Sequence, residues 1–138
     1  MREILFRGKR YDDGSWVEGY LIHDEFCNTH IPYIGYLCDA GHDVDIAEII
    51  LGTVGQFTGL TDKNGKKIFE GDIIEGHCHS QWSHRLQRCV VVYERDGFEA
   101  RHYVMQGGEE RYYAYKVLFS KDVVVIGNIH DNPELLGG

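Results

Sequence analysis

An all-β fold of short strands and frequent turns is predicted by three features of this sequence. The 138 residues include nine tyrosines, and 12% of the chain is aromatic, a composition that favours strands over helices. Seventeen glycines against two prolines indicate many tight turns. No long amphipathic helix, linker or internal repeat interrupts the short extended segments, so they fit a small barrel or roll.

The first half of the chain begins with a predicted hairpin. Residues 4–11 and 15–23 have the composition of strands, and Asp12-Asp13-Gly14 between them suits a short connection. The second strand alternates two sets of residues, so one of its faces is expected to be buried. The sets are Trp16, Glu18, Tyr20 and Ile22 on one face, and Val17, Gly19 and Leu21 on the other. Residues 31–37 predict another short strand, whereas residues 43–51 fit either a buried strand or one turn of helix.

The second half is built around two predicted hairpins. Strands at 52–58 and 67–76 flank Asn64-Gly65, the dipeptide that best tolerates the positive φ angles of a tight turn. Strands at 89–95 and 98–105 are joined through Asp96-Gly97.

The rest of this half is less regular. Residues 106–111 predict a polar loop, and residues 112–120 fit a strand or one short helix. Residues 122–130 predict a β-branched last strand that ends before Asn132-Pro133.

Charge and hydropathy exclude several classes of protein. The formal net charge of −8 disfavours a nucleic-acid partner unless basic residues cluster. The basic groups lie at 2–10, 63–67 and 84–88, and solvated strand edges and turn tips are the favoured interpretation of all three. No apolar run is long enough to span a membrane, and the N-terminus lacks signal-peptide features, so a cytoplasmic location with reduced cysteines is expected.

Two distinctive sequence motifs lie in the middle of the chain, at 53–74, and at its end, at 123–136. Their motif residues are Gly55, Gln56, Gly59, Asp62, Asn64, Gly65, Gly71, Asp72, Gly127 and Asn128. Together with the opening residues 2–22 and the hairpin 91–103, they make the sequence resemble the YopX family of bacteriophage and prophage proteins. The resemblance lapses in residues 24–51 and 77–88.

This resemblance implies an SH3-like β-barrel or roll at 59–138. An additional N-terminal β element at 1–58, consisting of the hairpin 4–23 and the variable segment 24–51, would pack on it. One compact domain over 1–138 is the alternative. The resemblance also implies a phage-encoded protein made in the cytoplasm of a bacterial host, without an established reaction.

The shared residues have a structural explanation. Gly65 suits a left-handed turn position, and Gly71 suits a bend at which a strand begins. Asp62 and Asp72 are expected to accept hydrogen bonds from loop amides. No phosphate-binding Walker motif is present, because Gly59 and Gly65 are one residue too far apart and Lys67 stands where Ser or Thr is required.

Cysteine and histidine offer a weak case for a metal site. Cys27, His30, Cys38 and His42 provide four zinc-ligand types in two close pairs, but the spacing matches no standard finger. A second set, His77, Cys78, His79, His84 and Cys89, has no recognised spacing either. We therefore expect surface loops, with no metal and no cofactor.

The predicted function rests on the expected fold, because the sequence contains no recognisable catalytic motif. No nucleophile elbow or singled-out carboxylate pair is found, so no catalytic residue is assigned and a non-enzymatic protein is expected. A protein-binding or adaptor module that contacts a host or phage protein, itself a homo-oligomer, is the favoured hypothesis. The alternative is a nucleic-acid-associated protein of phage replication or regulation that uses residues 2–10 and 63–67.

Overall fold

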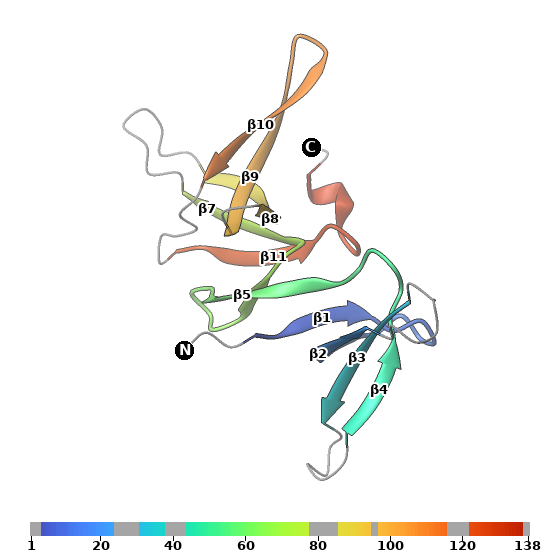
Figure 1. The fold of residues 1–138 in the computed structure, drawn as a ribbon. Helices are drawn as coiled ribbons and strands as arrows, with labels where there is room; N and C mark the ends of the chain where they lie inside the picture. Colours follow the sequence, from blue (N-terminus) through green and yellow to red (C-terminus); the bar gives the residue numbers. More distant parts are fainter. Residues whose placement is uncertain are drawn as a thin grey trace. The chain divides into compact units, whose positions relative to one another are not determined.

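The computed structural model describes residues 4–23, 31–37, 44–77, 86–94, 97–115 and 122–136. These residues form strands and one 3₁₀ turn, shown in Figure 1. The strands are β1 (Phe6–Lys9), β2 (Trp16–His23), β3 (Pro32–Leu37), β4 (Val44–Glu48), β5 (Gly55–Thr61), β6 (Lys67–Phe69), β7 (Asp72–His77), β8 (Leu86–Glu94), β9 (Gly97–Gln106), β10 (Glu109–Tyr115) and β11 (Val124–Asn128). The 3₁₀ turn η1 (Pro133–Leu135) follows the last strand.

The strands form two antiparallel sheets, which confirms the all-β prediction. Hydrogen bonding orders one sheet as β4-β3-β2-β1-β5-β6 and the other as β10-β9-β8-β7-β11. Among the residues that the structure describes there is no α-helix, and neither sheet closes into a barrel. The described residues also contain no helix long and apolar enough to cross a membrane.

Backbone contacts divide the chain into two compact units, Met1–Gly59 and Leu60–Gly138. In the first unit β1, β2, β3 and β4 pair with their neighbours in turn, and β5 pairs with the free side of β1. One bridge between Arg10 and Ile49 also links the ends of β1 and β4. Ile34, Ala47 and Ile49 form the core of this unit, with Phe6, Val17, Tyr36 and Val54 packed against them.

The second unit is a meander of β7, β8, β9 and β10, with β11 paired to the free side of β7 (Figure 1). Its core consists of Ile68, Ile74, Cys89, Val91, Ala100, Val123 and Val125, and Phe98 packs against this group. Cys89 is buried within this core and forms no disulfide in the described part of the chain.

The ambiguous segment 43–51 is a strand over Val44–Glu48, because it pairs with β3 and buries Ala47 against Ile34. Two other predictions were wrong. The single strand expected at 67–76 is two strands, since Gly71 adopts a φ of +91° and turns the chain between β6 and β7. The polar loop expected at 106–111 is only a tight turn at Gly107-Gly108, where φ is +61° and +82°, and β10 already begins at Glu109.

Candidate functional site

Apolar side chains gather on one face of the sheet formed by β2, β3 and β4. We call this surface the outer face; its members are Tyr20, Ile22, Tyr33, Leu37, Val44 and Ile46. The register places them together, because Ile22 lies opposite Tyr33, Leu37 opposite Val44, and Gly35 between Tyr20 and Ile46. Four of the six are largely exposed: Tyr20 at 69%, Leu37 at 67%, Val44 at 68% and Ile46 at 56%.

The core of this unit lies on the opposite face of the same strands, which explains why the described residues of the outer face are exposed. Val17, Ile34 and Ala47 point to the core, so the alternating residues must point the other way. Gly35 lies in the middle of the outer face, and a Cβ added there would approach the Ile22 side chain at 3.0 Å. Single exposed apolar residues are ordinary, whereas a contiguous group on neighbouring strands is typical of an interaction surface.

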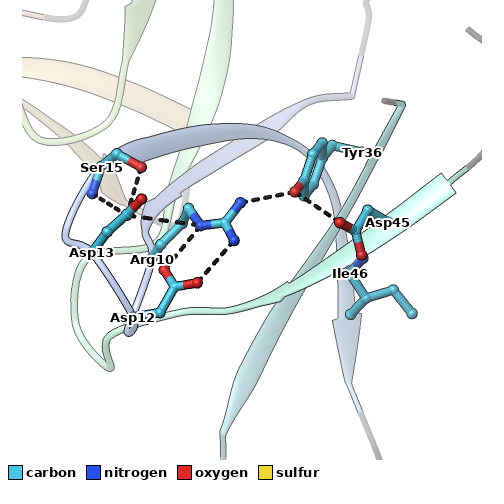
Figure 2. Close-up of polar contacts among 7 residues, drawn as sticks. All are labelled: Arg10, Asp12, Asp13, Ser15, Tyr36, Asp45 and Ile46. Carbon is cyan, nitrogen blue, oxygen red and sulfur yellow. Dashed lines mark hydrogen bonds and ion pairs between the residues drawn. The ribbon is translucent and has the colours of Figure 1, made fainter. Parts of the chain in front are cut away.

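A polar network lies on the inner side of β3 and β4 and reaches the β1–β2 turn (Figure 2). Arg10 donates from Nε and Nη2 to the two carboxylate oxygens of Asp12, at 3.0 and 2.9 Å. Its Nη1 donates to the Tyr36 hydroxyl at 2.8 Å, and that hydroxyl in turn donates to Asp45 Oδ2 at 3.2 Å. Asp45 Oδ1 accepts the backbone N–H of Ile46 at 2.8 Å. The Arg10 guanidinium therefore links the end of β1 to the end of β3 and, through Tyr36, to the start of β4.

Electrostatics within this network follow from the Arg10–Asp12 pair. Hydrogen bonding to Arg10 lowers the pKa of Asp12 from 3.8 to about 2, and hydrogen bonding to Asp12 raises the pKa of Arg10 above its ordinary value. Any stability that the Asp12 pair contributes is complete above pH 3.8 and is lost as the pH falls through about 2. Because both groups face solvent, screening keeps this contribution small.

Replacing Arg10 with glutamine is expected to return the pKa of Asp12 from about 2 towards 3.8, since the charged donor pair is removed. A pH titration of the Asp12 side-chain carbon by nuclear magnetic resonance measures this. Arg111→Gln, which removes an exposed arginine in the other unit, is the matched control and should leave Asp12 unchanged. An Asp12 pKa that stays at about 2 in Arg10→Gln would contradict the assigned cause.

The basic residues of β1 are directed at aromatic rings of the chain itself. The Arg7 guanidinium lies 4.6 Å from the Trp16 ring centre, and Lys9 Nζ lies 5.7 Å from the same ring. Arg10 lies 5.8 Å from the Tyr36 ring centre. Three cations of the first basic group, Arg7, Lys9 and Arg10, therefore contribute cation–π contacts within the first unit.

Two buried carboxylates hold loops of the second unit. Asp62 accepts the N–H groups of Asn64 and Lys66 on Oδ1, both at 2.9 Å, and that of Val125 on Oδ2 at 3.0 Å. Asp72 accepts the N–H of Phe69 at 2.8 Å. Both are thus used as the sequence predicted, as acceptors for backbone amides.

Gly127 and Asn128 end β11 and are followed by a turn that leads into η1. Asn128 Oδ1 accepts the backbone N–H groups of His130 and Asp131, and the Asn132 side chain accepts the N–H of Asn128. A Cβ on Gly127 would lie 2.6 Å from Asn132 Oδ1, so a side chain here would displace Asn132 from its hydrogen bond to Asn128.

The other motif residues also occupy backbone-determined positions. Gly55 and Gln56 are the residues of β5 that pair with Arg7 and Phe6 of β1. Asn64 and Gly65 lie in the turn between β5 and β6, where Gly65 has a φ of +82°. Gly59 has a φ of +87° within β5.

A pocket of ≈ 420 Å³ lies in the second unit, and of its lining residues the sequence analysis had noted only Arg88, within the basic group at 84–88. It is lined by Glu75, Leu86, Gln87, Arg88, His102, Tyr103, Leu135 and Leu136. Arg88 donates to Glu75 at 3.0 Å and to the Leu135 carbonyl at 3.1 Å, while His102 Nδ1 contacts the Arg88 carbonyl at 3.0 Å. These contacts join β7, β8, β9 and η1 to one another.

The metal-site candidates Cys27, His30, Cys38 and His42 lie outside the described residues. Of the second set, Cys78, His79 and His84 also lie outside them, whereas His77 pairs with Asp122 at 2.8 Å. The described parts of the chain contain no group of three or more His, Cys, Asp or Glu side chains placed to hold a metal.

Sequence reasoning missed the outer face and the role of Asp45. Alternation in β2 indicated that one of its faces would be exposed. Which residues of β3 and β4 join that face depends on the register between the strands, which the sequence does not show. The sequence signal for Asp45 was weak: one acidic residue in a strand whose neighbours are Val44 and Ile46.

Known proteins were compared with the chain as a whole. The sequence model of the YopX protein family matches residues 5–137. No curated protein matches the chain. The crystal structure of protein EF1440 from Enterococcus faecalis is similar, with 25% sequence identity and a TM-score of 0.50 over 99% of each chain. The family match spans nearly the whole sequence, and the chain belongs to the YopX family.

Proposed function

We propose that this YopX-family chain is a phage or prophage accessory protein that binds another protein and catalyses no reaction. Its partner is a host or phage protein encountered in the cytoplasm of the bacterial cell. The observation that carries the proposal is the outer face, a group of exposed apolar side chains on three adjacent strands. Aromatic and aliphatic residues of this kind form the centres of protein interfaces.

The charges near the outer face indicate the chemistry of the partner. Glu48 is exposed on the same side of β4 as the apolar residues, and the chain carries a net charge of −8. A partner surface with an apolar centre and flanking Lys or Arg residues complements both features.

Nucleic-acid binding receives less support. Arg7 and Lys9 of β1 contact the Trp16 ring. Arg10, just after β1, contacts Tyr36 and pairs with Asp12, so these three cations are engaged within the chain. Phosphate binding by this strand would have to replace those contacts. A salt-dependent gel shift at low ionic strength would favour this second function.

Binding through the outer face is tested with the double variant Tyr20→Ser/Leu37→Ser. The full chain is immobilised, a partner is captured from host lysate, and the purified partner is titrated against each variant. We expect at least about a tenfold loss of affinity, because two central apolar side chains are removed from the contact.

A matched control is available within the first unit. Tyr11 is 69% exposed and Leu51 is 75% exposed, and neither belongs to the outer face. Tyr11→Ser/Leu51→Ser removes one tyrosine and one leucine side chain, as the test variant does, and should leave the affinity for the partner unchanged. Equal loss of affinity in both double variants would exclude the outer face as the binding surface.

For the second unit we propose the finer description of an SH3-like roll. It is supported by the meander β7–β8–β9, the return of β11 to β7, and the short η1 turn at the end. A solution structure of the full chain in which this five-stranded sheet is strongly coiled around its core would support the roll. A flat sheet in the same strand order would rule it out.

A further inference from the structure

The turn between β5 and β6 contains the one Asn-Gly dipeptide of the sequence, Asn64-Gly65. Asparagine before glycine is especially prone to spontaneous loss of its side-chain amide, because glycine has no side chain to hinder ring closure. Both residues are exposed, and no described atom beyond the chain neighbours of Gly65 lies within 4 Å of where its Cβ would be. Water therefore reaches this turn.

Deamidation at this dipeptide needs only water as a co-reactant. The backbone nitrogen of Gly65 loses its proton and bonds to Asn64 Cγ, while the side-chain nitrogen of Asn64 takes up a proton and leaves as ammonia. Water then opens the cyclic imide. Opening at the side-chain carbonyl gives aspartate, and opening at the main-chain carbonyl gives isoaspartate. Either product carries a negative charge at neutral pH, which asparagine does not.

The contacts of the native turn oppose the first step of this reaction. The Gly65 N–H, whose nitrogen must become the nucleophile, donates to the Asp62 carbonyl at 3.0 Å. The N–H groups of Asn64 and Lys66 on either side both donate to Asp62 Oδ1 at 2.9 Å. Asp62 therefore binds three consecutive backbone N–H groups. The peptide between Asn64 and Gly65 cannot turn towards the Asn64 side chain until these contacts break.

The turn is also tied to the end strand of its sheet. Asp62 Oδ2 accepts the N–H of Val125 in β11 at 3.0 Å, and the Lys63 N–H donates to the Val123 carbonyl just before β11 at 3.0 Å. The Asp62 residue is only 7% exposed. Opening the turn therefore breaks contacts with a distant segment as well as those within the turn.

We propose that Asn64 is a deamidation site whose rate Asp62 controls: the closed turn resists the reaction, and transient opening permits it. The product cannot restore the native turn, because a new carboxylate lies close to that of Asp62, and isoaspartate also lengthens the main chain by its Cβ atom. The modification therefore records opening of the β5–β6 turn irreversibly. It stands apart from the partner binding proposed above, which uses the outer face of the first unit.

The first test compares the folded and unfolded states of the same chain. Wild-type protein is incubated at one temperature and slightly alkaline pH, in buffer and in urea that unfolds it, and peptide mapping by mass spectrometry gives the deamidated fraction at Asn64. We expect the folded chain to react at least about tenfold more slowly, because its rate follows the population of the open turn. Equal rates in the two states would overturn the proposal.

Asp62→Ala assigns the protection to the carboxylate. In buffer, with the fold checked by circular dichroism, Asn64 of this variant should deamidate at least about tenfold faster than in the wild type. Asp12→Ala removes an exposed carboxylate from a turn of the first unit and should leave the rate unchanged. A wild-type rate in folded Asp62→Ala would overturn the proposal, as would equal acceleration in both variants.

A measurement on the product decides the question even where Asp62→Ala fails to fold. Wild-type chain deamidated in urea is refolded and separated from unreacted chain by ion exchange on its added negative charge. Hydrogen exchange at the Val125 amide should be at least about tenfold faster in the deamidated chain, because its contact with Asp62 is lost. Unchanged exchange would mean that the turn closes again after the reaction, which overturns the proposal.

Discussion

Asp62→Ala is expected to lower the free energy of unfolding by about 3 to 4 kcal/mol, one of the largest effects in this protein. The carboxylate is buried and accepts three backbone N–H groups, two within its own turn and one from Val125 in β11. Alanine leaves these donors without an acceptor and disconnects the turn from a strand 63 residues away in the sequence. Urea unfolding followed by circular dichroism measures the change.

The pH dependence of stability gives a second readout of the same group. Burial raises the pKa of Asp62, but hydrogen bonds from Val125, Lys66 and Asn64 outweigh burial and hold the pKa below its ordinary 3.8. The stabilisation is therefore complete above pH 3.8 and is lost as the pH falls through the lowered pKa. Asp62→Ala should lose less stability than the wild type over this acid range.

Asp12→Ala is the control for Asp62→Ala. Asp12 also accepts hydrogen bonds in a turn, but it is exposed, and its loss should lower the free energy of unfolding far less than the loss of Asp62 does. Similar effects of the two variants would mean that the buried amide contacts of Asp62 do not stabilise the second unit.

Gly19→Ala is expected to destabilise the first unit by about 3 kcal/mol or more, since overpacking against backbone is at the upper end of such effects. Gly19 lies in β2, and an added Cβ would overlap the carbonyl oxygen of Gly35 and approach Ile34 Cγ2 at 2.9 Å. Ile34 is completely buried, and a carbonyl oxygen in a paired strand cannot rotate away. Native-state hydrogen exchange of the Ile34 amide measures the stability of this unit.

Gly14→Ala separates crowding from conformational strain. Gly14 has a φ of +75° and nothing within 4 Å of an added Cβ, so alanine there should destabilise by about 1 to 2 kcal/mol. If Gly19→Ala is no worse than Gly14→Ala, the close approach of β2 and β3 at this point is not what requires glycine.

Local sequence was sufficient for the parts of the fold that depend on neighbouring residues. The Asn64-Gly65 turn follows from the φ that glycine tolerates, and the alternation in β2 follows from the two-residue period of a strand. The β9–β10 hairpin was missed because Gly107-Gly108 is a complete turn, whereas the polar residues around it resemble a longer loop. The segment 43–51 stayed ambiguous because a five-residue strand and one turn of helix show similar apolar spacing.

The sequence by itself determined the all-β class, the turn glycines and the use of Asp62 and Asp72 as acceptors for backbone amides. Only the tertiary structure decided which residues form the outer face and that Asp45 occupies the edge of β4. Periodicity shows that a strand has two faces, but the register between strands determines which side chains meet across them. The contact of Arg10 with Tyr36, 26 residues apart, exists only because β3 and the β1–β2 turn fold onto one side of the sheet.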